Sequence, residues 1–167
     1  ALRFSSVYGN SKKLPYKETY DLRAEYPYDV SKASGDMIAK SYASDMFKLP
    51  VIITRFTNIY GPGQLNFTAL IPDCILSCFN YRTFIPRSNG LNKRDFLYVT
   101  DVAEAFYKAS ISDKTNQIYN LGAGNPQSIN YLVKLLGGPV EYIPKRPGEP
   151  DCTWADISKA KKLLNWE

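Results

Sequence analysis

The segment YPYDVSK places a tyrosine and a lysine, Tyr28 and Lys32, four residues apart. In an α-helix this spacing puts both side chains on one face. An ammonium group beside a phenol stabilises the phenolate and lowers the phenol's pKa from its usual value of about 10. Such a pair can move a proton to or from a hydroxyl or carbonyl group. The spacing alone is common in ordinary helices, so two interpretations stay open at this point, a catalytic pair or an unremarkable helix start.

The composition limits which residues could act as general acids or bases and as metal ligands. The chain has no histidine, so a general acid or base must be a tyrosine, a lysine, a cysteine or a carboxylate, and the commonest metal ligand is missing. The three cysteines, Cys74, Cys78 and Cys152, have no metal-type spacing and cannot all pair within one molecule. We therefore expect no metal site and a reducing, cytoplasmic setting.

The length of 167 residues fits one compact domain or a piece of a larger one. A hydrophobic fraction of 44% with 22% charged residues is typical of a globular chain and excludes a disordered one. No apolar run approaches the ~18 residues of a membrane-spanning helix, and no secretory signal heads the sequence. We therefore expect no membrane partner.

The net charge of +5 has two interpretations. The lysines are scattered and no run of five like charges occurs, which is typical of a solvated surface. The alternative is a site for an anionic small molecule that uses only a few of the basic residues. We expect no nucleic-acid partner, because no basic helix and no aromatic recognition signature is visible.

Strand-like and helix-like segments alternate along the chain, which predicts an α/β domain. Residues 28–47 have the apolar spacing of a helix, and Pro27 suits its first turn. Residues 49–56 (LPVIITRF) form a continuous apolar run rich in β-branched side chains, which is typical of a buried parallel strand. The glycines and proline of residues 59–66 then predict a loop.

The second half of the chain continues this alternation. Two candidate strands, 82–87 and 94–99, flank a turn at residues 88–90. Asp101 and Glu104 have the spacing of a capping box at the start of a helix over 100–110. The remaining predicted elements are helices over 67–79, 128–138 (closed by Gly137 and Gly138) and 156–166, and a strand over 117–124 that ends in a glycine-rich loop.

Two features indicate that a part of a larger protein is present. A dinucleotide-binding fold needs G-x-G-x-x-G at its first turn, and the sequence contains no such segment. The chain begins in the strand-like ALRFSSVYG and ends at Trp166–Glu167, directly after a predicted helix. We therefore expect both ends to be cut.

Seven segments together resemble the extended short-chain dehydrogenase/reductase family, specifically its NAD-dependent nucleotide-sugar epimerases and dehydratases. They follow the family's order and cover essentially the whole chain: SSVYG, YPYDVSK, TRFTNIYGPG, RDFLYVTDVAEAF, YNLGAG, RPGEP and WADISKAKKLLNW. The segment GPGQLNF followed by IP is most similar to CDP-glucose 4,6-dehydratases. The tail RPGEPDCTWADISKAKKLLNW is more similar to UDP-sugar 4-epimerases, so the identity of the sugar nucleotide stays open.

The resemblance implies roles for the matched residues. Tyr28 and Lys32 look like the family's catalytic Tyr-x-x-x-Lys, with Tyr28 as the acid/base on the sugar hydroxyl while hydride passes to NAD. Lys32 would hold the nicotinamide ribose and depress the pKa of the tyrosine, so both residues are also cofactor-binding candidates. Asn58 would bind the sugar or a phosphate oxygen, and Asn66 and Leu70 would line the sugar-nucleotide cleft. Each asparagine has an alternative role in a loop turn.

Two arginines are implied to bind the substrate diphosphate. Arg94 and Arg146 would clamp it, a task that suits a planar guanidinium, although either could be an ordinary surface residue. Residues 83–86 would border the nucleotide base. With Asn58, Asn66 and Leu70, these arginines complete the predicted binding site for a nucleotide-diphosphate sugar.

The sequence also departs from the family. The family has a Ser or Thr four residues before the tyrosine of VYG, and counting back from Tyr8 reaches Phe4, which cannot donate a hydrogen bond. Ser5 or Ser6 substitutes only if the register is shifted. Sugar dehydratases also carry an acidic residue just after that position, whereas this sequence has Ser5 and Ser6 there. The absence of an acidic residue favours epimerase or reductase chemistry over dehydration.

The implied fold is the C-terminal half of a Rossmann-like doubly wound α/β fold plus a small substrate-binding region. Residues 1–60 would be the last part of the NAD-binding domain. Residues 61–167 would be mainly the substrate region, with a strand and a helix returning to the Rossmann part. The first half, with its glycine motif, is missing, so we expect NAD to bind the complete parent enzyme and to bind this chain weakly or not at all.

Three hypotheses about function follow. The leading one is the C-terminal portion of an NAD-dependent nucleotide-sugar epimerase/dehydratase, acting by transient oxidation at sugar C4 and inactive alone. The alternatives are a non-catalytic nucleotide-sugar-binding module and a fragment that persists only with another chain. The family packs the helix of Tyr28 against a partner subunit, so we also expect a homo-oligomer. The apolar set on that helix is Ala33, Met37, Ile38, Ala43 and Met46.

Overall fold

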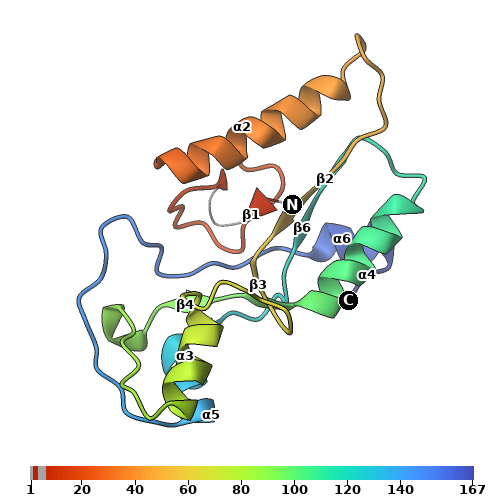
Figure 1. Ribbon diagram of the computed structural model, residues 1–167. Helices are drawn as coiled ribbons and strands as arrows, with labels where there is room; N and C mark the ends of the chain where they lie inside the picture. The colour runs from red at the N-terminus through yellow and green to blue at the C-terminus, as the bar shows by residue number, and fades with distance from the viewer. Residues whose placement is uncertain (1, 4–6) are drawn as a thin grey trace.

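A three-stranded parallel sheet lies at the centre of the chain in the computed structural model, which describes residues 2–3 and 7–167 (Figure 1). The strands lie in the order β1 (Leu2–Arg3), β2 (Ile52–Phe56) and β6 (Gln117–Leu121). β2 and β6 pair from Ile52 opposite Gln117 to Phe56 opposite Leu121. The predicted buried parallel strand is confirmed, because β2 has a parallel neighbour on each side and buries all but its first residue.

Helices cover both faces of this sheet, and they are α2 (Pro27–Tyr42), α4 (Val99–Ser110) and α6 (Ser158–Leu164). Successive side chains of a strand point to opposite faces. Arg55 of β2 therefore meets Asp36 of α2, whereas the next residue, Phe56, packs in one cluster with Ala105 of α4. Figure 1 shows α2 on one side of the strands and α4 with α6 on the other. The α/β prediction is confirmed, with helices on both sides of the sheet.

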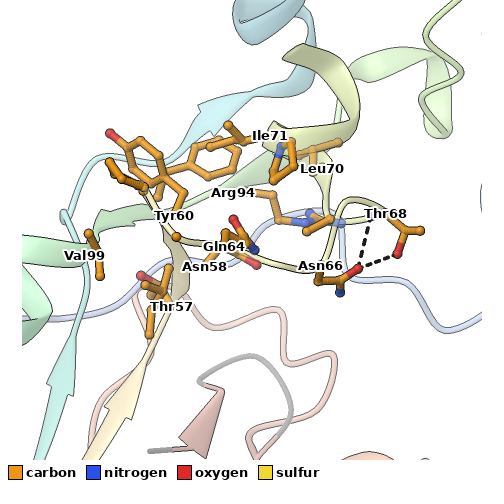
Figure 2. A pocket seen from close by; sticks show the side chains of 17 residues that line it. Thr57, Asn58, Tyr60, Gln64, Asn66, Thr68, Leu70, Ile71, Arg94 and Val99 are labelled. Atoms are coloured by element: carbon orange, nitrogen blue, oxygen red, sulfur yellow. Dashed lines mark hydrogen bonds between the residues drawn. The ribbon is translucent and has the colours of Figure 1, made fainter. Parts of the chain in front are cut away.

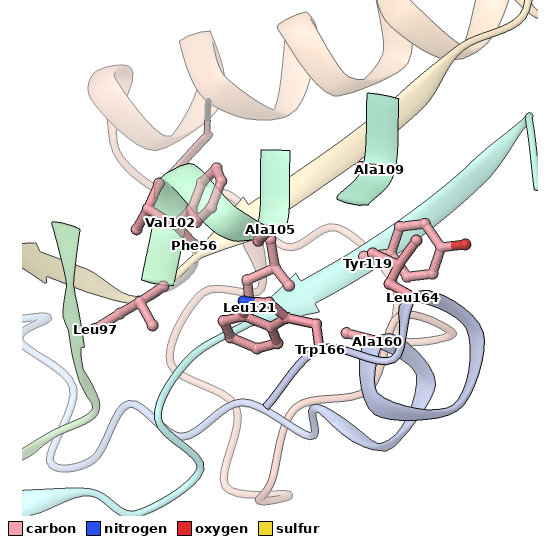
Figure 3. Close-up of a cluster of buried hydrophobic side chains, with 10 residues drawn as sticks. All are labelled: Phe56, Leu97, Val102, Ala105, Ala109, Tyr119, Leu121, Ala160, Leu164 and Trp166. Atoms are coloured by element: carbon pink, nitrogen blue, oxygen red, sulfur yellow. The ribbon is translucent and has the colours of Figure 1, made fainter. Parts of the chain in front are cut away.

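The main hydrophobic core fills the space between the sheet and the helices α4 and α6 (Figure 3). Trp166 is completely buried there, and its Nε1 donates a hydrogen bond to the backbone oxygen of Asp101 across 3.0 Å. Burying a large apolar side chain contributes about 1.5–3 kcal/mol to the free energy of unfolding. The burial of Trp166 therefore stabilises the packing of the last residues against α4. The buried residues of this core are Phe56, Leu97, Val102, Ala105, Ala109, Tyr119, Leu121, Ala160, Leu164 and Trp166.

A smaller layer lies beyond the carboxyl ends of β2 and β6. Helices α3 (Leu70–Phe79) and α5 (Ile129–Leu136) pack there around a core formed by Cys74, Phe84 and Ile129. Ser128 caps α5 by accepting a bond from the Tyr131 amide at 3.1 Å. The short strands of this layer are β3 (Asn58–Tyr60), β5 (Phe96–Tyr98), β4 (Lys93–Arg94) and β7 (Gln127–Ser128), paired β3 with β5 and β4 with β7.

Several predicted boundaries are wrong. Asp101 is not a helix cap, because α4 already begins at Val99 after an extended Tyr98, and this places Asp101 inside the first turn. Residues 82–87 form no strand; they make single bridges to residues 140 and 143, and the following residues 88–90 adopt a short 3-10 turn. The predicted end of α5 is confirmed, since Gly137 follows its last residue with φ +74°.

The apolar set predicted for α2 is only partly on its surface. Ala33 is buried against the rest of the chain, and Met37 and Ile38 are 62% and 58% exposed. The helix ends at Tyr42, so Ala43 and Met46 lie beyond it. In the part of the chain that the structure describes, no helix combines the length and the apolar character needed to cross a membrane.

Candidate functional site

Tyr28 and Lys32 lie side by side near the start of α2. The Lys32 ammonium is 5.2 Å from the centre of the Tyr28 ring, which confirms the predicted shared face. Tyr28 is 51% exposed, so its hydroxyl is accessible from outside the described chain. Pro27 occupies the first helical position, where its fixed φ suits a helix start.

A buried polar network holds α2 against the sheet. The Arg55 guanidinium donates from Nε to Asp36 Oδ2 at 2.7 Å and from Nη1 to the Tyr8 hydroxyl. Tyr8 in turn donates to Asn120 Oδ1 at 2.9 Å, and Asn120 Nδ2 donates to the backbone oxygen of Tyr16 at 3.0 Å. These side chains are all almost fully buried, and they join α2, β2, β6 and the segment after β1. The orientation of the helix that carries Tyr28 is therefore set by long-range hydrogen bonds.

A cavity of about 520 Å³ lies between the loop after β2 and the start of α3 (Figure 2). The predicted residues Asn58, Asn66, Leu70 and Arg94 all line it. Asn58 Nδ2 donates to Thr153 Oγ1 at 3.1 Å, so its side chain is already oriented before any ligand binds.

Asn66 serves the loop as well as the cavity. Its Oδ1 accepts bonds from the backbone N and the Oγ1 of Thr68, at 3.1 and 2.7 Å. This is the loop-turn alternative for an asparagine, and it coexists with a place on the cavity wall.

A second cavity of about 270 Å³ shares Thr68, Leu70 and Arg94 with the first, so the two adjoin. Arg146 lines it, and so do Phe84, Ile85 and Pro86, but not Thr83. Arg87 also lines it, a third arginine that the motifs of the sequence do not single out. The five predicted substrate-binding residues are thus brought together on two joined cavities.

Arg94 is the most constrained of these cations. Its Nη2 donates to Glu149 Oε1 at 2.9 Å, and its Nη1 donates to the backbone oxygens of Pro150 and Lys93 at 3.0 and 2.9 Å. Burial lowers the pKa of Arg94, and the charge of Glu149 opposes that effect. Arg146 is exposed and makes no ion pair within the described residues, so its charge is available to a ligand.

The sequence motifs did not identify Glu149 as a candidate site residue. It lines the second cavity, and its Oε2 is buried without a hydrogen-bond partner among the described residues. A carboxylate oxygen only accepts hydrogen bonds, so the hydroxyl group of a ligand could serve as its donor. Glu149 lies three residues after Arg146 in the segment RPGEP, and this position could have identified it from the sequence.

Asp95 lies between Arg94 and Phe96, two residues that line the first cavity. It is completely buried, and its Oδ2 accepts a bond from the Ala155 amide at 3.1 Å. Burial raises the pKa of Asp95, while backbone amides such as that of Ala155 oppose the rise. Gly122 lies so close that an added Cβ would clash with the Asp95 carboxylate and approach Thr57 Cγ2 to 2.9 Å.

The structure places the predicted catalytic pair outside the two joined cavities. Among the residues it describes, Tyr28 and Lys32 line neither of the joined cavities. Phe4, Ser5 and Ser6, where the family's Ser or Thr was sought, lie outside the described residues.

The sequence and the fold both match known proteins. Residues 2–122 match the model of the NAD dependent epimerase/dehydratase family. Human dTDP-D-glucose 4,6-dehydratase is 34% identical over 90% of this chain and 42% of its own length. UDP-glucuronate 4-epimerase of Thermodesulfobacterium geofontis is 33% identical over 98% of this chain and 52% of its own length.

Solved structures agree with these relatives. UDP-glucuronic acid 4-epimerase of Bacillus cereus, in complex with UDP-glucuronic acid and NAD, superposes with a TM-score of 0.91 at 28% identity, over 99% of this chain and 55% of that chain. dTDP-glucose 4,6-dehydratase of Bacillus anthracis, in complex with NAD, gives a TM-score of 0.88 at 32% identity over the same shares. The chain therefore spans about half the length of these relatives. The predicted Rossmann-like α/β fold is confirmed. The chain belongs to the NAD-dependent epimerase/dehydratase family.

Proposed function

We propose that this chain provides the nucleotide-sugar-binding part of an NAD-dependent epimerase or dehydratase that oxidises the sugar transiently at C4. The observation that carries the proposal is the convergence of Arg94, Arg146 and Asn58 on two joined cavities. In this proposal residues 1–60 complete the NAD-binding part, and residues 61–167 form mainly the substrate region. The names of the relatives support C4, since both a 4,6-dehydratase and a 4-epimerase act at that position.

The arginines would bind the diphosphate of the substrate. Arg94 is held by two backbone oxygens and Glu149, so its guanidinium is oriented in advance and loses little entropy on binding. Arg146 would add the second cation from the facing loop, and charge-assisted bonds to phosphate are stronger than neutral ones. Glu149 Oε2 would accept a hydrogen bond from a ribose hydroxyl, and residues 84–86 would border the base.

Tyr28 and Lys32 would carry out the proton transfer. NAD, when bound, supplies the acceptor for the hydride that leaves the sugar carbon. Lys32 and Tyr28 are exposed enough to hold the nicotinamide ribose, but the sequence has no G-x-G-x-x-G turn for the NAD diphosphate. Tyr28 would take the proton of the sugar hydroxyl while Lys32 keeps the phenol in place. The chain by itself is therefore proposed to be inactive.

A non-catalytic nucleotide-sugar-binding module is the second candidate. One observation favours it: neither Tyr28 nor Lys32 is among the residues that line the two joined cavities. Adding a glycine-rich first half from an NAD-binding relative distinguishes the two. Turnover that is lost in Tyr28→Phe supports the enzyme, whereas unchanged binding with no turnover supports the module.

The binding proposal is tested by thermal unfolding with UDP-glucose and dTDP-glucose. A ligand at 100 times its Kd stabilises the folded chain by about 2.7 kcal/mol, so a clear rise in Tm is expected. Arg146→Ala should reduce that rise, and because this side chain is exposed the variant should fold normally. Arg23→Ala is the matched control, an exposed arginine outside both cavities. No rise in Tm with either nucleotide sugar would rule the proposal out.

A further inference from the structure

Tyr26 contacts the loop that carries Arg146 and Glu149. Gly148 of that loop has φ +74°, and an added Cβ there would lie 2.7 Å from Cε2 of the Tyr26 ring and closer still to its hydroxyl. Gly148 is thus confined both by its backbone conformation and by the tyrosine ring. A residue at the start of α2 and the proposed diphosphate loop are therefore in direct contact.

The loop end of this contact is linked to Arg94 through the ion pair of Glu149. The Glu149 amide donates to the Arg146 oxygen at 3.1 Å, which closes a turn with Gly148 inside it. Glu149 is also the carboxylate paired with Arg94. A phosphate that binds Arg94 competes with Glu149 for the same guanidinium, so ligand binding acts on the turn that holds Gly148.

The helix end of the contact lies two residues from Tyr28. Tyr26 is the residue just before the helix, and its backbone oxygen accepts the first helical bond from the Val30 amide at 2.8 Å. Pro27 follows it with a restricted φ. A displacement of Tyr26 is therefore passed to the first turn of α2, because the intervening backbone has little freedom to absorb it.

A small cavity gives Tyr26 room to move. It has a volume of about 90 Å³ and is lined by Tyr26, Glu25, Asp29, Gly148 and Pro150, together with the turn at residues 9–10. Tyr26 itself is 45% exposed. The Tyr26 ring therefore contacts the loop and is not part of a packed core.

We infer that Tyr26 is a positioning residue that couples occupation of the Arg94–Arg146 site to the placement of Tyr28. This rests on the proposed nucleotide-sugar site. Coupling between sites is reciprocal, so a ligand on the arginines orders the first turn of α2, and an ordered first turn favours the ligand. Coupling is measured by following both segments in the same experiment.

Hydrogen exchange followed by mass spectrometry, with UDP as the probe, tests the coupling on the chain as it is. In the parent, UDP should slow amide exchange in residues 143–151 and also in residues 26–33. In Tyr26→Ser, UDP should still slow exchange in the first segment but no longer in the second, whereas Tyr26→Phe should behave like the parent. Tyr131→Ser is the matched control, a tyrosine of similar exposure on α5.

A second comparison needs no ligand. Gly148→Ala should displace the Tyr26 ring and speed exchange in residues 26–33 by roughly fivefold. Gly137→Ala is the control for backbone strain, since Gly137 has the same φ of +74° with no atom within 4 Å of an added Cβ. It should leave residues 26–33 unchanged.

The outcomes separate this inference from the proposed function. If UDP slows exchange only in residues 143–151 of the parent, or in both segments of Tyr26→Ser, the coupling through Tyr26 is wrong and the binding site stands. If UDP slows neither segment, the proposed site fails, and Gly148→Ala alone decides whether Tyr26 positions the helix. Unchanged exchange in Gly148→Ala would then overturn the inference.

Discussion

Arg55 Nε donates a hydrogen bond to Asp36 Oδ2 across 2.7 Å, and both side chains are almost completely withdrawn from solvent. Lys40 reaches the other carboxylate oxygen of Asp36 at 3.1 Å. Removing one partner of such a pair leaves a buried charge without compensation, which costs more than the pair itself contributes. The pair joins α2 to the central strand, so its loss should lower the free energy of unfolding of the whole chain.

We expect Asp36→Asn to lower the free energy of unfolding by about 3–5 kcal/mol, measured by urea titration. The apolar double variant Asp36→Leu with Arg55→Met should recover most of that loss, because it removes both desolvated charges. Asp73→Asn is the control: it breaks the exposed Asp73–Arg82 pair and should cost about 1 kcal/mol or less. Equal losses for Asp36→Asn and Asp73→Asn would contradict the expectation.

The same carboxylate makes stability depend on pH. Burial alone would raise the pKa of Asp36, but the hydrogen bond and charge of Arg55, with those of Lys40, hold it below its ordinary value. A lowered folded pKa stabilises the chain above the unfolded pKa of about 3.9, and that contribution is lost as the pH falls through the folded pKa. The difference in unfolding free energy between the parent and Asp36→Asn should therefore be constant above about pH 5 and shrink in more acidic buffer. A difference that stays constant into the acid range would refute this.

Gly122 has no room for a side chain. An alanine there would clash with the Asp95 carboxylate and come within 2.9 Å of Thr57 Cγ2 and 3.0 Å of Ala155 Cβ. We expect Gly122→Ala to cost about 1–3 kcal/mol, since overpacking a well-filled site forces its neighbours to shift. Gly63→Ala, where an added Cβ meets nothing within 4 Å, should cost only its backbone strain of about 1 kcal/mol. Chemical denaturation of both variants makes the comparison, and an equal cost would show that the packing around Gly122 is not tight.

Binding of NAD to this chain alone should be weak or absent. The sequence has no G-x-G-x-x-G turn, whose amides bind the NAD diphosphate in Rossmann-like folds. Isothermal titration with NAD is the measurement, with UDP as the positive control for a folded site. Micromolar NAD affinity together with UDP binding would show that the chain holds the cofactor by other groups.

Association through α2 is expected at micromolar concentration. Met37 and Ile38 are largely exposed on one side of this helix, and covering apolar surface contributes about 25 cal/mol per Å². Sedimentation should show a dimer or a larger oligomer, and Met37→Lys should shift it toward monomer. Phe79→Lys, at a comparably exposed apolar residue of α3, should leave the distribution unchanged. A monomeric parent chain would end this hypothesis.

Local patterns in the sequence were sufficient to predict several helices and strands, and to predict which side chains share one face of a helix. Helical spacing alone placed Lys32 beside Tyr28, the predicted apolar run at residues 49–56 contains the central strand β2 (Ile52–Phe56), and Gly137 ended its helix as predicted. These features depend on periods of two and 3.6 residues, which can be read along the chain. Asp101 failed as a cap because Ser/Thr/Asp patterns recur inside helices, and the backbone of Tyr98 decided where α4 begins.

The tertiary structure decided which distant residues meet. Arg94 and Glu149 are 55 residues apart, and Arg55 and Asp36 are 19 apart, yet each pair shares one hydrogen bond. The contact of Tyr26 with Gly148 also joins two segments that are far apart in the sequence. No local period encodes such pairings, because they follow from the order of strands in the sheet and from the packing of loops at its carboxyl edge. The motif residues could therefore be named from the sequence, while the partners that orient them could not.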